Sequence, residues 1–138
     1  IVPRSHQGQA SAKRARADEP TVHDVYILGK DIQNRFPDKA FSPEATEDRR
    51  FCSFFGCRAA VALMAWQMLN AYEFLPDSLT LVHLLWALFF LKRYPTEEHA
   101  CSTVGGSQGA IDPKTLRKHI WPLIMALSDL EPHVVSMF

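Results

Sequence analysis

The chain has 138 residues, of which 47% are hydrophobic, and this is enough apolar material for one small domain with a buried core. Its 15 basic and 15 acidic residues cancel, so overall charge does not draw the protein toward nucleic acid or a membrane surface. Any binding to DNA must therefore come from a local patch. The odd number of cysteines, three, indicates free thiols in a reducing compartment.

The N-terminal part of the chain shows little periodicity. Residues 1–20 are rich in Ala, Ser, Gln, Arg and Pro, which predicts a disordered tail. The cluster of Lys13, Arg14 and Arg16 is of the kind found in short nuclear localisation signals, so a nuclear location is expected. Residues 21–41 contain one apolar patch around Val25, which fits either a short helix or an extended arm. Because both ends look cut, we expect a fragment of a longer protein.

From residue 42 to 138 the pattern predicts a helical domain. Ser42-Pro43 is a typical helix start, and Gly56 is a typical stop after Phe55. The charged residues of this helix are expected to stay in water, namely Glu44, Glu47, Asp48, Arg49 and Arg50. A further helix over residues 58–72 is expected to place one side in the core, made of Val61, Met64, Ala65, Met68 and Leu69.

The run LTLVHLLWALFFL at residues 79–91 is apolar on every side of a helix, with Thr80 and His83 as its polar members. A membrane span needs about 20 apolar residues, so this run predicts the buried centre of a helical bundle and no membrane partner. Trp86 in its middle should be buried. His83 is expected to be a core or boundary histidine and not a ligand.

Residues 96–127 have the outline of a helix-turn-helix. Thr96 is of a type that caps helix N-termini, and Gly105-Gly106 can end the first helix after about two turns. Asp112-Pro113 restarts a helix that should run to Leu127, with Pro122 as an interruption. The second helix of such a motif can enter a DNA major groove.

This second helix has two different sides. Apolar residues recur on one side at Leu116, Ile120, Leu123, Ile124 and Leu127. The other side carries Lys114, Arg117, Lys118 and Trp121, with Thr115 and His119 nearby. The basic side chains could neutralise phosphates, and an arginine could donate two hydrogen bonds to a guanine edge. The alternative is that these residues are the solvated face of an amphipathic helix.

Motifs for catalysis or metal binding are missing from the sequence. It contains no nucleophile elbow, P-loop or HExxH pattern, so no enzyme activity or cofactor is expected of this chain. The spacings of Cys52, Cys57, His99 and Cys101 match no common zinc site, so no metal is expected. The fold class predicted is all-α, a small bundle of about five helices.

Four segments in order resemble one protein family. They are RRFCSFFGC at 49–57, LVHLLWALFFLKRYPTEEHACSTVGG at 81–106, DPKTLRKHIWPLI at 112–124 and ALSDLEPHVV at 126–135. Together they are similar to the helical region that precedes the nuclease domain in Harbinger-like DDE transposases of the algal and diatom type. The resemblance implies that helices 97–104 and 113–127 bind double-stranded transposon-end DNA.

The resemblance also implies which residues of this chain face the DNA, namely Lys114, Thr115, Arg117 and Lys118. The stretch GGSQGA lengthens the turn relative to the family pattern. The metal-binding carboxylates of the family would lie beyond Phe138, in a nuclease domain that this chain does not contain. The sequence thus predicts a transposase-like DNA-binding domain. The alternative is a helical protein–protein interaction module with no role in nucleic-acid binding.

Overall fold

The computed structural model describes residues 19–33 and 44–135, and over these ranges the protein is all-α, without strands, as the sequence predicts. Six α-helices and one short 3-10 helix follow each other, namely α2 (Val22–Ile32), α3 (Glu44–Phe55), α4 (Ala59–Ala71), α5 (Leu81–Arg93), α6 (Glu97–Val104), η1 (Gly106–Gln108) and α7 (Pro113–Val135). The predictions for the tail before residue 19 and for a helix start at Ser42-Pro43 concern residues outside the described ranges.

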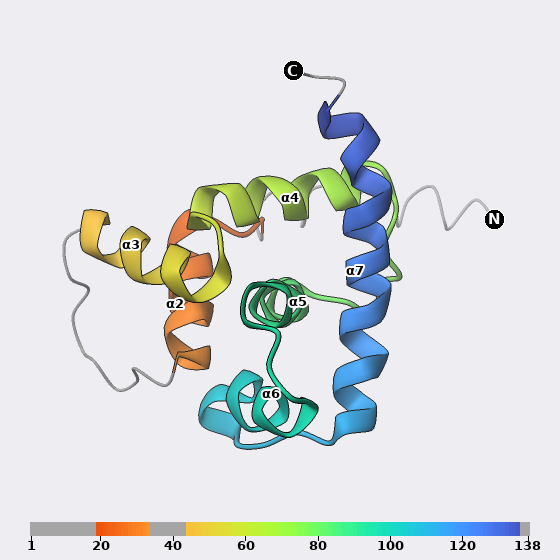
Figure 1. Ribbon diagram of the computed structural model, residues 1–138. Helices are drawn as coiled ribbons and strands as arrows, with labels where there is room; N and C mark the ends of the chain where they lie inside the picture. Colours follow the sequence, from red (N-terminus) through yellow and green to blue (C-terminus); the bar gives the residue numbers. More distant parts are fainter. Residues whose placement is uncertain (1–18, 34–43, 136–138) are drawn as a thin grey trace, which may run out of the picture.

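Helix α5 lies at the centre of the bundle, as Figure 1 shows in a view along its axis. It packs against α2, α3, α4 and α7. Leu84, Leu85 and Ala87 are fully buried, and Trp86 keeps only 8% of its surface in water, as its place in the apolar run predicts. Burial on every side accounts for the almost unbroken apolar sequence of this helix.

For the first part of the segment 21–41 the structure shows a helix and not an extended arm, because Val22–Ile32 forms the capped helix α2. Residues 34–41 of that segment lie outside the described ranges. Thr21 accepts a hydrogen bond from the Asp24 amide, and the Asp24 carboxylate accepts one from the Thr21 amide. Gly29 lets α2 approach α3 closely, since a methyl group there would lie 2.8 Å from the Phe51 ring. With α2, the described ranges contain six α-helices, one more than the sequence predicted.

A buried ion pair also joins α2 to α3. The Nζ atom of Lys30 lies 3.9 Å from Oε1 of Glu47, and both residues are almost fully buried. The prediction that Glu47 stays in water is therefore wrong. The reason is that α2 covers this side of α3 and supplies a cation there, which the charge pattern of residues 44–50 alone could not reveal.

The prediction for α4 is also wrong in part. Its buried residues are Ala59, Ala62 and Leu69, whereas Val61 and Met64 are about half exposed. Because α4 is apolar around most of its circumference, the spacing of its apolar residues does not say which side faces the core.

The contact at Gly29 yields a prediction about stability. In an open helix, Gly→Ala stabilises by about 1 kcal/mol, but overpacking a core costs about 1–3 kcal/mol. Gly29→Ala should therefore lower the free energy of unfolding, because the buried Phe51 ring cannot move aside. Urea unfolding measures this change. In a Phe51→Leu background the same substitution should cost less, and an equal cost in both backgrounds would contradict the proposed clash.

Candidate nucleic-acid interface

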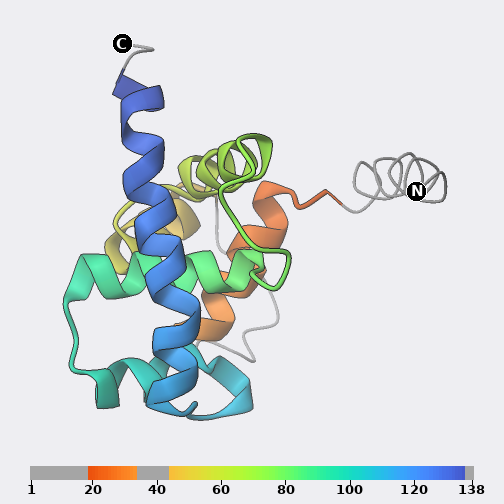
Figure 2. The same cartoon turned by 90° about the vertical axis from the view of Figure 1, so that its right-hand side faces the viewer.

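Helix α7 is the longest helix and crosses α6, α5 and α4 in turn, which Figure 2 shows along its whole length. The sequence predicted an end near Leu127 and an interruption at Pro122, and both predictions are wrong, because α7 continues through Pro122 and Pro132 to Val135. Pro122 removes the hydrogen bond to the Lys118 carbonyl. Both residues lie on the exposed side of α7, where water can solvate that carbonyl instead.

Helix α6 and the following turn place the start of α7. The Thr96 hydroxyl accepts a hydrogen bond from the His99 amide at 3.1 Å, so the predicted N-cap is confirmed. In the long turn, the Ser107 amide donates to the Asp31 carboxylate of α2 at 3.1 Å. The Ile111 amide donates to the Cys101 carbonyl at 3.0 Å. The extra residues of the turn are thus fixed against both α2 and α6.

The four residues predicted to face DNA differ in their surroundings. Lys114 and Lys118 are exposed and lie one helical turn apart on the outward side of α7. Thr115 is half-buried, and its carbonyl accepts a hydrogen bond from Nδ1 of His119 at 2.8 Å. The structure therefore brings Lys114 and Lys118 together in solvent, whereas Thr115 is less accessible than the two lysines.

Arg117 has a partner that the sequence did not reveal. Its Nη1 atom lies 2.9 and 2.8 Å from the two carboxylate oxygens of Glu97, at the start of α6. Both side chains are about half exposed, so this ion pair contributes little to stability, but it ties α6 to α7. The sequence features that could have suggested this ion pair are the positions of the two residues, with Glu97 in the first turn of one predicted helix and Arg117 near the start of the next.

An exposed row of residues runs along the outside of α7. We call this row, consisting of Lys114, Lys118, Trp121 and Met125, the α7 stripe. Trp121 is 47% exposed and Met125 is 66% exposed, although both are large apolar residues. The Trp121 ring packs against Phe90 of α5, with centroids 6.0 Å apart and planes at 69°. Sequence spacing placed Trp121 beside the lysines but did not single out Met125.

A pair of stacked histidines connects α5 to α7 beneath the interface. The rings of His83 and His119 lie 4.1 Å apart at an angle of 21°, and both contact Trp86. The Thr80 amide donates to Nδ1 of His83 at 3.0 Å, so His83 caps its own helix. Burial, and then the neighbouring His119, lower the pKa of His83 from 6.5 to about 4. His83 is therefore neutral at physiological pH.

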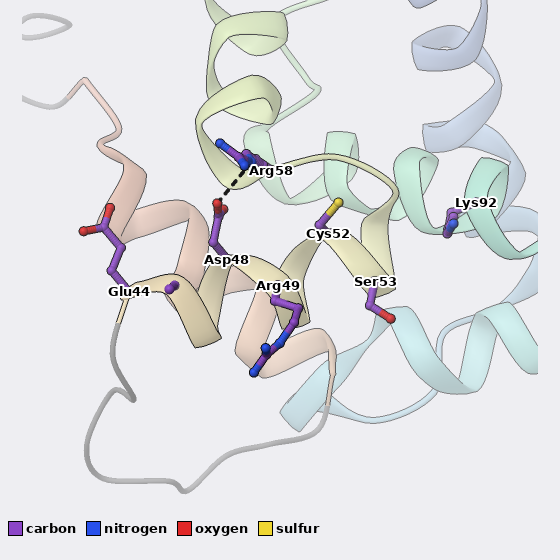
Figure 3. Close-up of a pocket in the computed structure, with 8 residues that line it drawn as sticks. Glu44, Asp48, Arg49, Cys52, Ser53, Arg58 and Lys92 are labelled. Carbon is purple, nitrogen blue, oxygen red and sulfur yellow. Dashed lines mark ion pairs between the residues drawn. The ribbon is translucent and has the colours of Figure 1, made fainter.

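A cleft lies beside α3, away from α7. It has a volume of about 810 Å³ and is lined by Glu44, Asp48, Arg49, Cys52, Ser53, Arg58 and Lys92, with no residue of α7. Arg58 forms an ion pair with Asp48, with Nε and Oδ2 3.4 Å apart. Figure 3 shows this pair and shows that Glu44 and Arg49 point away from it. The labelled side chains do not converge on one point, so the cleft shows no catalytic or ligand-binding arrangement.

Cys52, Cys57 and Cys101 are free thiols, of which Cys52 and Cys57 are partly buried and Cys101 is buried. Burial, with a smaller effect of Cys52, raises the pKa of Cys57 to about 11, and burial raises the pKa of Cys101. Both thiols thus stay protonated at neutral pH and are poor nucleophiles. Within residues 19–33 and 44–135, no group of three or more His, Cys, Asp or Glu side chains is arranged to hold a metal ion.

Comparisons with protein-family models, curated proteins and solved structures found no match to this chain. Among the helices of the described ranges, none is by itself long and apolar enough to cross a membrane. Only α3 and α4 taken together, bent by 59° at their junction, reach the required length and composition.

The histidine pair predicts how stability depends on pH. The folded state keeps His83 neutral down to a pKa of about 4, whereas the unfolded chain protonates it near 6.5. Its contribution to stability is therefore fully present above pH 6.5 and disappears as the pH falls toward 4. The melting temperature should decrease over this window. His83→Gln keeps a capping acceptor but cannot be protonated, so the melting temperature of this variant should decrease less over the same window. An equal decrease in the variant and the unchanged protein would show that protonation of His83 is not the cause.

Proposed function

We propose that the α6–α7 helix-turn-helix binds double-stranded DNA, as the DNA-binding domain of a transposase-like protein that acts in the nucleus. The observation that carries this proposal is the exposed pair Lys114 and Lys118 on the outward side of α7, whose inward side is fixed by α5 and α6. A chain with no net charge needs such a local patch to bind a polyanion.

The two lysines suit contact with a phosphate backbone. They are four residues apart, which corresponds to about 6 Å along the helix axis. Both lie in the first two turns of α7, where the positive end of the helix dipole adds to their charge. Phosphate contacts of this kind position a helix on the duplex and do not depend on base sequence.

Arg117 would join this contact by exchanging its partner. Its exposed ion pair with Glu97 is weak, and a DNA phosphate or a guanine edge can replace the carboxylate. Glu97 thus opposes DNA binding in two ways, because it occupies the guanidinium and adds a negative charge to the interface. In this proposal phosphoryl transfer belongs to the nuclease domain of the resembled family, and this chain positions the DNA.

The competing function is that of a helical protein–protein interaction module. The observation that favours it is the apolar outer side of α4, where Val61 is 46% exposed and Met64 is 54% exposed. An amphipathic partner helix could dock on such a side. Salt separates the two functions, because apolar docking changes little with ionic strength whereas binding through phosphates weakens steeply.

The first test removes both lysines. Lys114→Ala/Lys118→Ala should stay folded, because alanine favours helices, and should weaken binding to a short blunt duplex of mixed sequence. Because the variant can no longer neutralise two phosphates, the slope of log K against log salt should flatten by about 1.8. Fluorescence anisotropy titrations at about 50 and 200 mM salt measure both effects.

The matched control is Arg49→Ala/Lys92→Ala. It makes the same change in net charge, but its residues line the cleft beside α3 and lie away from α7. Its affinity and salt slope should stay close to those of the unchanged protein. Equal weakening in the two double variants would indicate a general charge effect, and unchanged binding in the α7 variant would reject the helix-turn-helix assignment.

A second test concerns the ion pair. Glu97→Gln should raise the affinity for the same duplex by up to about fivefold, since it releases Arg117 from a surface pair worth about 0.2–1 kcal/mol. Glu98→Gln is the matched control, because it removes the same charge from the neighbouring position without touching Arg117. If the two variants gain equally, the gain comes from charge alone and Arg117 has no part in the contact.

A further inference from the structure

Trp121 is the feature of the α7 stripe that phosphate binding does not explain. The inward side of α7 is filled by Leu116, Ile120 and Leu123, which are almost completely buried. Trp121 lies outside this core, with 47% of its surface in water, and follows Lys118 on the same side of the helix. A large ring left in solvent beside basic residues has the composition of a nucleic-acid contact.

The indole is held in place from one side. Phe90 meets it edge to face, with ring centroids 6.0 Å apart, and Phe90 is anchored in the central helix α5. An aromatic ring braced in this way needs little further ordering when a second flat group stacks on it. Met125, one turn further along α7, adds an exposed apolar contact next to the ring.

We propose that Trp121 is a stacking platform for an unpaired DNA base, so that α7 prefers a junction between duplex and single strand. This inference rests on the proposed function. Within a continuous duplex both faces of each base are covered by its neighbours, so an exposed indole can stack only on a base that has left the duplex. Every base has such a face, and the contact would therefore tolerate many sequences.

The charges along α7 fix the direction in which the strand would lie. Lys118 and Lys114 precede Trp121 by three and seven residues, or about 5 and 10 Å along the helix axis. Asp129 and Glu131 are exposed further on, toward the C-terminal end. The phosphates of the duplex would thus lie over the start of α7 near α6, and the unpaired base would reach Trp121.

The test compares two probes, a blunt DNA duplex and the same duplex with a short single-stranded extension. Trp121→Leu keeps an apolar side chain but removes the ring, and should weaken binding of the extended probe by about 5- to 150-fold, the usual effect of removing one base–aromatic stack. Trp121→Phe should retain most of the affinity. Binding of the blunt probe should be the same in all three proteins.

The matched control is Tyr72→Leu, which removes an aromatic ring of similar exposure, 43%, outside the α7 stripe. It should leave both probes unaffected. Tryptophan fluorescence gives a second readout, since stacking should quench the part of the signal that disappears in Trp121→Phe. This quenching should occur with the extended probe and not with the blunt one.

The outcomes separate the inference from the proposed function. If Trp121→Leu binds the extended probe as well as the unchanged protein does, the stacking role is rejected, while blunt-duplex binding through Lys114 and Lys118 still stands. Equal weakening for both probes would place Trp121 against duplex DNA and would also overturn the inference. If the unchanged protein binds neither probe, the proposed function fails together with the inference, and the α7 stripe must be tested for docking of a protein.

Discussion

The need to bury α5 on every side governs the architecture of this domain. A helix whose sequence is apolar around its whole circumference cannot lie at a surface, so other helices must cover it from several directions. Helices α2, α3, α4 and α7 do so, and α7 extends past α5 to reach α6 at one end and α4 at the other. The length of α7 is thus a consequence of covering the centre, and one side of it remains in solvent throughout.

Polar contacts then set how the surrounding helices are oriented. The buried pair of Lys30 and Glu47 fixes α2 against α3, and removing either partner would take this ion pair from a charge that stays buried. The exposed contacts between Asp31 and Ser107 and between Glu97 and Arg117 are individually weak. Their effect is geometric, because they place the long turn and the first turns of α7. The candidate interface is therefore built on helices that are fixed from the core side.

Two surfaces of different chemistry result from this packing. The outside of α7 combines positive charge with a braced indole, which suits a polyanion carrying flat bases. The outer side of α4 is apolar and uncharged, with Val61 and Met64 in solvent, which suits a protein partner. Under the proposed function the outside of α7 would contact the nucleic acid, and the apolar side of α4 would remain open to a protein partner.

The sequence by itself determined the helical class, the buried centre, the ends of α6 and the start of α7. These depend on local signals, namely apolar periodicity, capping residues and glycines, which act within a few residues of the chain. It also placed Lys114, Arg117, Lys118 and Trp121 on one side of a helix. Only the tertiary structure decided that Glu47 is buried, that Met64 is exposed and that Arg117 is paired with Glu97. Each of these three features depends on which segment, distant in sequence, packs against the residue. When a helix is apolar or charged on several sides, its local sequence does not predict which side another segment will cover.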